Sequence, residues 1–154
     1  MRPVVSPSGW PRADPVPDGA DPVTLTRRVL EAADKGDFDT AVSIYSPDAV
    51  WDSGSVDIPG ERFEGRAAIR GLLEQWFGML EASESHIEEL REVGNGVVLL
   101  HLAQRAKPRG SSAWLDAHLA MVSTWADGLV RENLVYTDID EARAAAERLA
   151  EERR

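Results

Sequence analysis

The chain has 154 residues, of which 43% are hydrophobic and 29% charged, a composition typical of one globular domain. It contains no cysteine, which excludes disulfides, thiol nucleophiles and thiolate metal sites and fits a reducing compartment. Its formal net charge of −10 opposes binding to nucleic acid or anionic lipid, because both need clustered Lys or Arg. No apolar run is long enough to span a bilayer and prolines interrupt the N-terminal segment, so we expect a cytoplasmic protein.

Residues 1–20 are rich in Pro, Gly, Ser and Asp and show no periodicity, which predicts a flexible tail ahead of one domain over residues 21–154. Asp21 followed by proline has the pattern of a helix N-cap with proline at the first helical position. We expect this helix to end at Gly36. Asp37 predicts the cap of a second, short helix that runs to Tyr45, before a Ser-Pro-Asp break.

The middle of the chain predicts a strand, a loop and a third helix. Residues 49–53 alternate as a strand, with Trp51 and Ser53 on one face and Asp52 on the other. A Gly- and Pro-containing loop follows. A wide apolar stripe then predicts a helix, formed by Ile69, Leu72, Leu73, Trp76, Phe77 and Leu80.

The second half of the chain is dominated by predicted strands. Residues 83–93 are Glu-rich and would suit a helix by composition alone. Asp127-Gly128 predicts a tight hairpin turn, and Asp138 followed by Glu141 predicts the capping box of a last, Ala-rich helix. Helices followed by antiparallel strands indicate an α+β fold. The expected strands cover residues 97–105, 114–125 and 129–137.

Four short motifs resemble the SnoaL-like group of the nuclear transport factor 2-like superfamily, and the similarity extends over residues 21–146. It implies a cone-shaped, strongly curved, mainly antiparallel sheet packed against three N-terminal helices around one apolar pocket, plus a short C-terminal helix. It makes residues 83–93 a strand and implies a homodimer that pairs through the outer sheet face. The motifs are Lys35-Gly36-Asp37-Phe38-Asp39 with Tyr45-Ser46-Pro47-Asp48-Ala49-Val50-Trp51, then Phe63-Glu64-Gly65-Arg66-Ala67-Ala68-Ile69, then Trp125-Ala126-Asp127-Gly128, and Tyr136-Thr137-Asp138 before Glu141-Ala142.

Proteins of this build include isomerases, epoxide hydrolases, polyketide cyclases, dehydratases and binding modules, so the fold does not decide the function. One hypothesis is a cofactor-independent enzyme that isomerises, dehydrates or cyclises an apolar steroid, terpenoid or polyketide. The other is a non-catalytic ligand-binding or protein-interaction domain of the same fold. We expect neither a cofactor nor a metal.

His101 is the first catalytic candidate. Both faces of its strand are apolar near the centre, so alternation alone does not choose the inward face. Comparison with the epoxide hydrolases of this fold places their catalytic arginine at His101 and their two acids at Ala103 and Val135, which implies that His101 lies in the pocket. An imidazole, with a pKa of about 6.5, suits proton transfer near neutral pH. The alternative is a core histidine, and the two apolar acid positions argue against epoxide hydrolysis.

Asp52 is the second catalytic candidate, because isomerases of this fold place a basic aspartate on the same strand. In the alignment, the position of that aspartate corresponds to Ser53. Asp52 therefore faces away from the pocket unless a bulge turns it inward. We expect Asp52 to act as an acid or base and Ser53 to donate a hydrogen bond to the ligand.

The remaining candidates are predicted to bind the ligand. On the strand over residues 114–125 the odd-numbered side chains are the more apolar and are placed inside, which puts Asp116 and His118 outside. Asn133 is expected to anchor a ligand carbonyl, while Tyr136 falls on the opposite face. The large side chains expected to line the pocket are Trp51, Trp76, Phe77, Met121 and Trp125.

Overall fold

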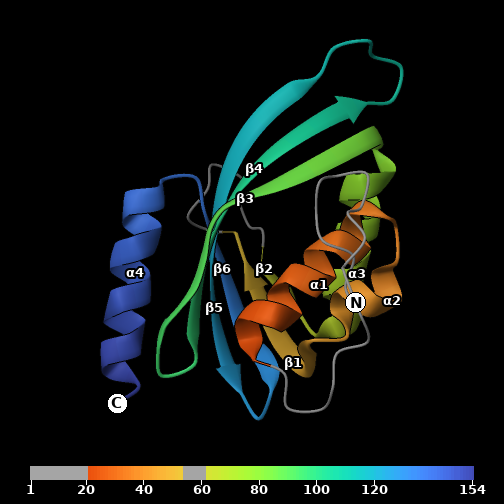
Figure 1. Ribbon diagram of the computed structural model, residues 1–154. Helices are drawn as coiled ribbons and strands as arrows, with labels where there is room; N and C mark the ends of the chain where they lie inside the picture. The colour runs from red at the N-terminus through yellow and green to blue at the C-terminus, as the bar shows by residue number, and fades with distance from the viewer. Residues whose placement is uncertain (1–20, 54–61) are drawn as a thin grey trace, which may run out of the picture.

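The computed structural model describes residues 21–53 and 62–154, so the predicted tail over residues 1–20 lies outside the described residues. The described residues form an α+β fold in which one six-stranded sheet carries helices on both faces (Figure 1). The elements, in chain order, are α1 (Pro22–Asp34), α2 (Phe38–Val42), β1 (Tyr45–Asp52), β2 (Arg62–Glu64), α3 (Arg66–Gly78), β3 (Leu80–Gly94), β4 (Val97–Pro108), β5 (Leu115–Ala126), β6 (Leu129–Tyr136) and α4 (Ile139–Glu152).

The strand order across the sheet is β2-β1-β6-β5-β4-β3. All neighbouring strands are antiparallel except β1 and β6, which run parallel. The mainly antiparallel α+β architecture is therefore confirmed. The cone is not, because the long strands bend without curling the sheet into a closed shape (Figure 1).

We call the face of the sheet toward α1, α2 and α3 the inner face, and the face under α4 the outer face. Alternate residues of each strand supply the two faces. The inner core joins Val29 of α1 and Ile69 of α3 to the strand residues Tyr45, Ala49, Trp51, Val98, Trp125, Val130 and Val135. The outer core joins Val97, Leu99, Ala120 and Val122 to Ala142, Ala146 and Ala150 of α4.

The predicted helix caps are confirmed. Asp21 Oδ1 accepts a hydrogen bond from Thr24 N at 2.9 Å, and Asp37 and Asp138 cap α2 and α4 in the same way. These bonds satisfy main-chain N–H groups that have no partner inside the helix.

The start of β1 differs from the prediction. The expected break at Pro47 lies inside the strand, and Tyr45 is its first residue rather than the end of a helix. The pairing of β1 with β6 is irregular between Tyr45 and Val50, and Pro47 is exposed there. A bulge accommodates a residue that has no N–H, so this proline bends the strand instead of ending it.

The Gly65-Arg66 pair fixes α3 against β1. Gly65 adopts a φ of 94° and its N–H donates to Ala49 O at 2.7 Å. Arg66 Nε donates to the carbonyl oxygen of Tyr45 at 3.0 Å, and Nη2 of the same guanidinium also contacts that oxygen. This part of the sequence motif therefore has a structural role, which is to orient the third helix across the inner face.

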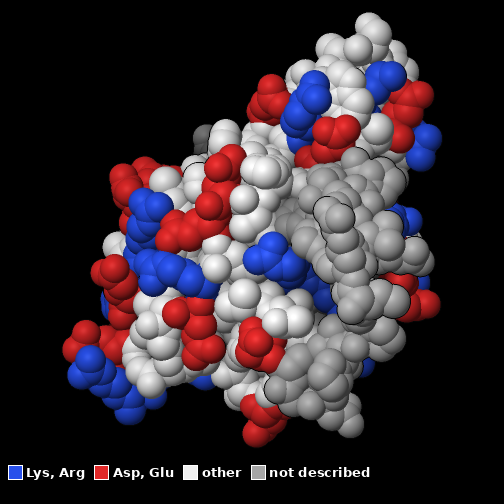
Figure 2. Space-filling view, in the orientation of Figure 1, with Lys and Arg blue, Asp and Glu red and all other residues white. Residues whose placement is uncertain are grey.

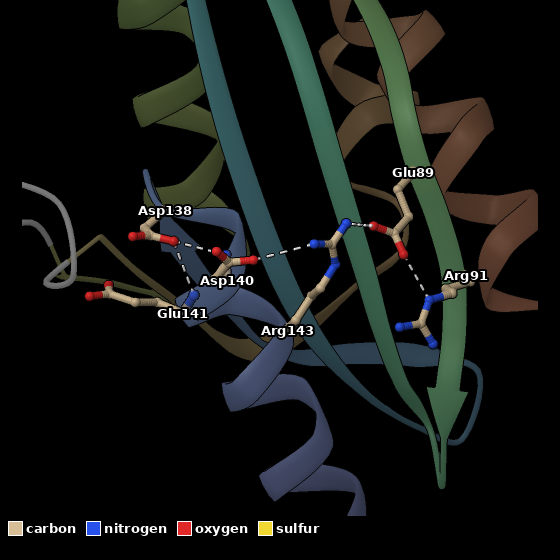
Figure 3. Close-up of polar contacts among 6 residues, drawn as sticks. All are labelled: Glu89, Arg91, Asp138, Asp140, Glu141 and Arg143. Carbon is tan, nitrogen blue, oxygen red and sulfur yellow. Dashed lines mark hydrogen bonds and ion pairs between the residues drawn. The ribbon is translucent and has the colours of Figure 1, made fainter.

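The C-terminal helix lies on the outer face and is held by polar contacts at both ends. Arg143 pairs with Glu89 of β3 near the start of α4 (Figure 3). Near its end, Asn95 Nδ2 donates to Ala150 O at 2.6 Å, and Arg153 Nη2 donates to Trp125 O at 2.6 Å. Among the described residues, no helix is both long and apolar enough to cross a membrane.

Candidate functional site

The apolar stripe of α3 becomes more exposed along the helix. Ile69, near the N-terminal end, is fully buried at 0% exposure. Leu72 and Leu73 are partly exposed although they pack against the inner core, and Trp76 at the C-terminal end is 39% exposed. The side chains of α3 are therefore buried at the start of the helix and increasingly exposed toward its end.

The inner face of β5 shows the same gradient. Trp125 is 4% exposed, Met121 and Leu119 are partly exposed, and Leu115 is 57% exposed. The exposed end of α3 and the exposed end of β5 lie at the same end of the molecule. β3 begins directly after α3, and its first residues pair with the end of β4. The end of β4 in turn pairs with the start of β5. The exposed apolar side chains Trp76, Met79 and Leu115 belong to this end of the molecule.

Two tryptophans on the inner face are fixed by serines of their own strands. Trp51 Nε1 donates to Ser53 Oγ at 2.9 Å, and Trp125 Nε1 donates to Ser123 Oγ at 2.9 Å. Each serine lies two residues from its tryptophan and therefore on the same face. Satisfying the indole N–H in this way lets a large aromatic ring form part of an apolar wall.

Asn133 lies on the inner face, beside Trp51 on the neighbouring strand. The residue is 3% exposed, and its one side-chain hydrogen bond among the described residues runs from Nδ2 to Met121 Sδ at 3.6 Å. A thioether is a weak acceptor, so the amide group has hydrogen-bonding capacity to spare. Tyr45 also faces this wall, its ring centroid 6.4 Å from that of Trp51, and it is a lining residue that the sequence pattern did not predict.

The expected position of His101 is wrong. β4 pairs with β5 without a register shift, and Leu100 and Leu102 face the inner side. His101 therefore lies on the outer face with Leu99, and its ring centroid is 5.5 Å from that of His118. The same register places Ala103 on the outer face as well.

Asp52 also lies on the outer face, because it pairs with Leu134, which packs in the outer core. Its Oδ2 forms an ion pair with Arg62 Nη1 of β2 at 3.3 Å. No bulge turns it inward, since β1 is regular from Val50 to Asp52. Neither of the two residues predicted to transfer protons thus contacts the inner wall.

The predicted lining residues separate into three locations. Trp51, Ser53, Met121, Trp125 and Asn133 are on the inner face of the sheet. Trp76 is at the exposed end. Phe77 packs instead between the helices, against Phe38 at 5.9 Å between ring centroids and against Ala32, Ala33 and Ala41.

A hollow of about 450 Å³ lies on the outer face of the sheet, beyond α4. It surrounds Ala103 and holds charged side chains of both signs. Within residues 21–53 and 62–154, no three histidine or carboxylate side chains are placed to hold a metal ion. The residues that line it include Glu84, His86, Glu88, Arg105, Asp116 and His118.

On the face shown in Figure 2, the charged residues of the described part of the chain are of both signs. Figure 2 shows Lys and Arg interspersed with Asp and Glu over the visible face. Several of these charges are paired, as in Lys107 with Glu81 and Arg131 with Asp48. Among the described residues on this face, Lys and Arg do not gather into the kind of cluster that a phosphate backbone requires.

Solved structures with the same fold come from several kinds of protein, and no curated protein matches the sequence. An epoxide hydrolase of the LEH-like type from M. tuberculosis is 18% identical with a TM-score of 0.62, over 82% of this chain and 89% of that one. A putative SnoaL-like polyketide cyclase from Shewanella denitrificans is 14% identical with a TM-score of 0.61, over 84% and 99% of the two chains. TerC, co-crystallised with polyporic acid, is 16% identical with a TM-score of 0.59, over 80% and 98%.

These identities are low, and the structures therefore establish the fold alone. The sequence itself is more specific, because the pattern of the SnoaL-like domain matches residues 26–133. That segment runs from within α1 into β6 and includes most of the inner face of the sheet. The chain belongs to the SnoaL-like domain family.

Proposed function

We propose that the chain binds a neutral, apolar small molecule of the steroid, terpenoid or polyketide type between the inner face of the sheet and helices α1 and α3. The observation that carries this proposal is a set of apolar side chains that pack against the inner core and still remain partly exposed. Leu72, Leu119 and Met121 are the central members. A ligand that covers them gains about 25 cal/mol for each Å² of apolar surface removed from water.

Asn133 supplies the polar contact in this proposal. Its amide is buried, and its Nδ2 donates only to the weak thioether acceptor of Met121. A ligand carbonyl would accept a stronger hydrogen bond from the same N–H group, which is the usual way in which one polar residue orients a ligand in an apolar pocket. The complex of TerC with polyporic acid supports a small molecule as the kind of ligand.

The proposal is one of binding rather than proton transfer, because His101 and Asp52 lie on the outer face. General acid–base catalysis needs a group within hydrogen-bonding reach of the reacting proton. The predicted homodimer is a separate matter. It would use the outer face, of which α4 already covers a part.

The test is thermal unfolding of the protein with a panel of steroid, terpenoid and aromatic ketones. A ligand at a hundred times its dissociation constant stabilises the folded state by about 2.7 kcal/mol. We expect at least one compound class to raise the melting temperature, Asn133→Leu to weaken binding severalfold, and His101→Ala to leave it unchanged. The proposal fails if no compound shifts the wild type. It also fails if His101→Ala abolishes a shift that Asn133→Leu retains.

A further inference from the structure

The three histidines of the chain lie on the outer face of three neighbouring strands. His86 of β3 and His118 of β5 both pair with Ala103 of β4, one from each side. His101 precedes Ala103 by two residues on the same strand and therefore shares its face. The small side chain of Ala103 occupies little of the space among these imidazoles, and the hollow on the outer face surrounds it.

His101 and His118 are close enough to bind one metal ion together. Their ring centroids lie 5.5 Å apart, and the ring planes are inclined by 45°. An ion about 2.0 Å from a ring nitrogen lies about 3.2 Å from the ring centroid, so two rings on one ion have centroids up to about 6.4 Å apart. The unshifted register of β4 and β5 fixes the two backbones. Because His118 is exposed and His101 partly exposed, an ion can reach both rings from water.

The charges around the hollow favour a cation. The carboxylates of Glu84, Glu88 and Asp116 and the guanidinium of Arg105 line it, which leaves a net charge of −2 when the imidazoles are neutral. Arg105 is shared between Glu84 at 3.8 Å and Asp116 at 3.4 Å, whereas Glu88 takes part in no ion pair within the described part of the chain. A metal binds the neutral form of imidazole, so these carboxylates add to its attraction.

The donor set restricts the kind of metal. Imidazole nitrogens with water in the remaining positions suit Cu²⁺ or Ni²⁺, and Cu²⁺ is the strongest binder among the divalent first-row ions. A structural zinc site has four protein ligands, and the described residues do not place even three suitable side chains together. Mg²⁺ and Ca²⁺ prefer oxygen ligands and would gain nothing from the imidazoles.

We propose that His101 and His118 form a surface site for a divalent transition-metal ion that prefers nitrogen ligands, with water completing its coordination. The sequence placed the two histidines on opposite faces and predicted no metal, whereas the register of β4 brings them together. The site lies across the sheet from the inner face. It is therefore independent of the proposed binding of an apolar ligand.

The experiment measures Cu²⁺ binding to the full chain, without an affinity tag, by calorimetric titration. We expect the wild type to bind a single Cu²⁺ per chain. His101→Gln or His118→Gln should weaken binding by more than about tenfold, because losing even an outer-shell partner of a metal ligand costs about that much. His86→Gln is the matched control and should leave the affinity unchanged, since His86 lies on the far side of Ala103. Electron paramagnetic resonance should show two coupled imidazole nitrogens in the wild type and one in either weakened variant.

Three results would overturn the inference. Equal weakening by His86→Gln would mean that any exposed imidazole of the chain binds the metal. Displacement of Cu²⁺ by an equal concentration of Mg²⁺ would assign the binding to the carboxylates. Unchanged affinity of His118→Gln would exclude the histidine pair, and this test stands even if His101→Gln fails to fold, because His118 is exposed. None of these results bears on the proposed ligand of the inner face.

Discussion

Arg143 Nη2 in α4 donates to Glu89 Oε1 in β3 across 2.7 Å, and this ion pair fastens the C-terminal helix to an edge of the sheet (Figure 3). The second carboxylate oxygen of Glu89 accepts from Arg91 Nε at 2.8 Å. The hydrogen bonds from Arg91 and Arg143 hold the pKa of Glu89 below its ordinary value. Glu89 is thus a carboxylate whose charge contributes to the stability of the folded state.

Glu89→Gln should lower the free energy of unfolding by about 0.5–1 kcal/mol near pH 7, the range of partly exposed ion pairs. The pKa of Glu89 is lower in the folded than in the unfolded state, so its contribution is present above the unfolded pKa and is lost as pH falls through the folded pKa. The difference between variant and wild type should therefore close in acid. Urea unfolding at pH 7 and at acidic pH measures this difference in unfolding free energy. Glu92→Gln on the same exposed strand is the control. A difference that persists in acid would contradict the ionic explanation.

Alanines of α4 form the contact with the outer face, and their small size sets the distance between helix and sheet. Ala146 is buried against this core, whereas Ala144 is exposed on the opposite side of the helix. Ala146→Leu should cost about 1–3 kcal/mol by overpacking, while Ala144→Leu should be close to neutral. Chemical denaturation of the two variants measures both losses of unfolding free energy. Equal effects would mean that α4 is not packed as described.

Ser123 should stabilise the protein through the Trp125 indole. Ser123→Ala leaves a buried N–H without an acceptor and should cost about 1–3 kcal/mol. Ser112, which is exposed in the loop after β4, provides the control substitution to alanine. Denaturant unfolding measures the stability of both variants. An effect no larger than that of Ser112→Ala would show that water replaces the serine.

Alanine substitutions at Gly96 and Gly110 distinguish the cost of backbone strain from the cost of a steric clash. Both glycines adopt a positive φ, of 78° and 79°, but a Cβ on Gly96 would lie 2.8 Å from Trp125 O, whereas nothing lies within 4 Å of one on Gly110. Gly110→Ala should cost about 1 kcal/mol, the penalty of the left-handed conformation alone. Gly96→Ala should cost clearly more, because the hairpin must also move away from Trp125. If the two variants lost the same unfolding free energy, the close contact between the added Cβ and Trp125 O would have no measurable cost.

Local signals in the sequence predicted the parts of the fold that local interactions determine. The aspartate caps at Asp21, Asp37 and Asp138 and the turn at Asp127-Gly128 depend on neighbouring residues only. The Glu-rich stretch over residues 83–93 was ambiguous by composition, and only family resemblance made it a strand, which the structure extends to Leu80–Gly94. Its charges fit the structure because β3 is an edge strand, where charged side chains remain in water and oppose further pairing.

The face of His101 could not be predicted from alternation, because β4 is covered on both sides. Leu99 packs under α4 and Leu100 packs toward α1, so apolar residues occupy consecutive positions. On β5 the exposed end keeps a polar outer side, and the inner set was predicted correctly from Met121 and Trp125. The inward face of a strand was therefore predictable where its other face meets water, as on β5, and unpredictable where α4 covers that other face, as on β4.

The parallel pairing of β1 with β6 joins residues 45–52 to residues 129–136. β1 therefore lies in the sheet interior although it is the first strand of the chain, and its second neighbour is the last strand. During synthesis, the inner face of the sheet, which the N-terminal helices cover, is complete only after nearly the whole domain has been made. Because so long a loop must close, folding should be slow for the size of the chain. Until β6 has been synthesised, the backbone edge of β1 that pairs with it is also open to self-association.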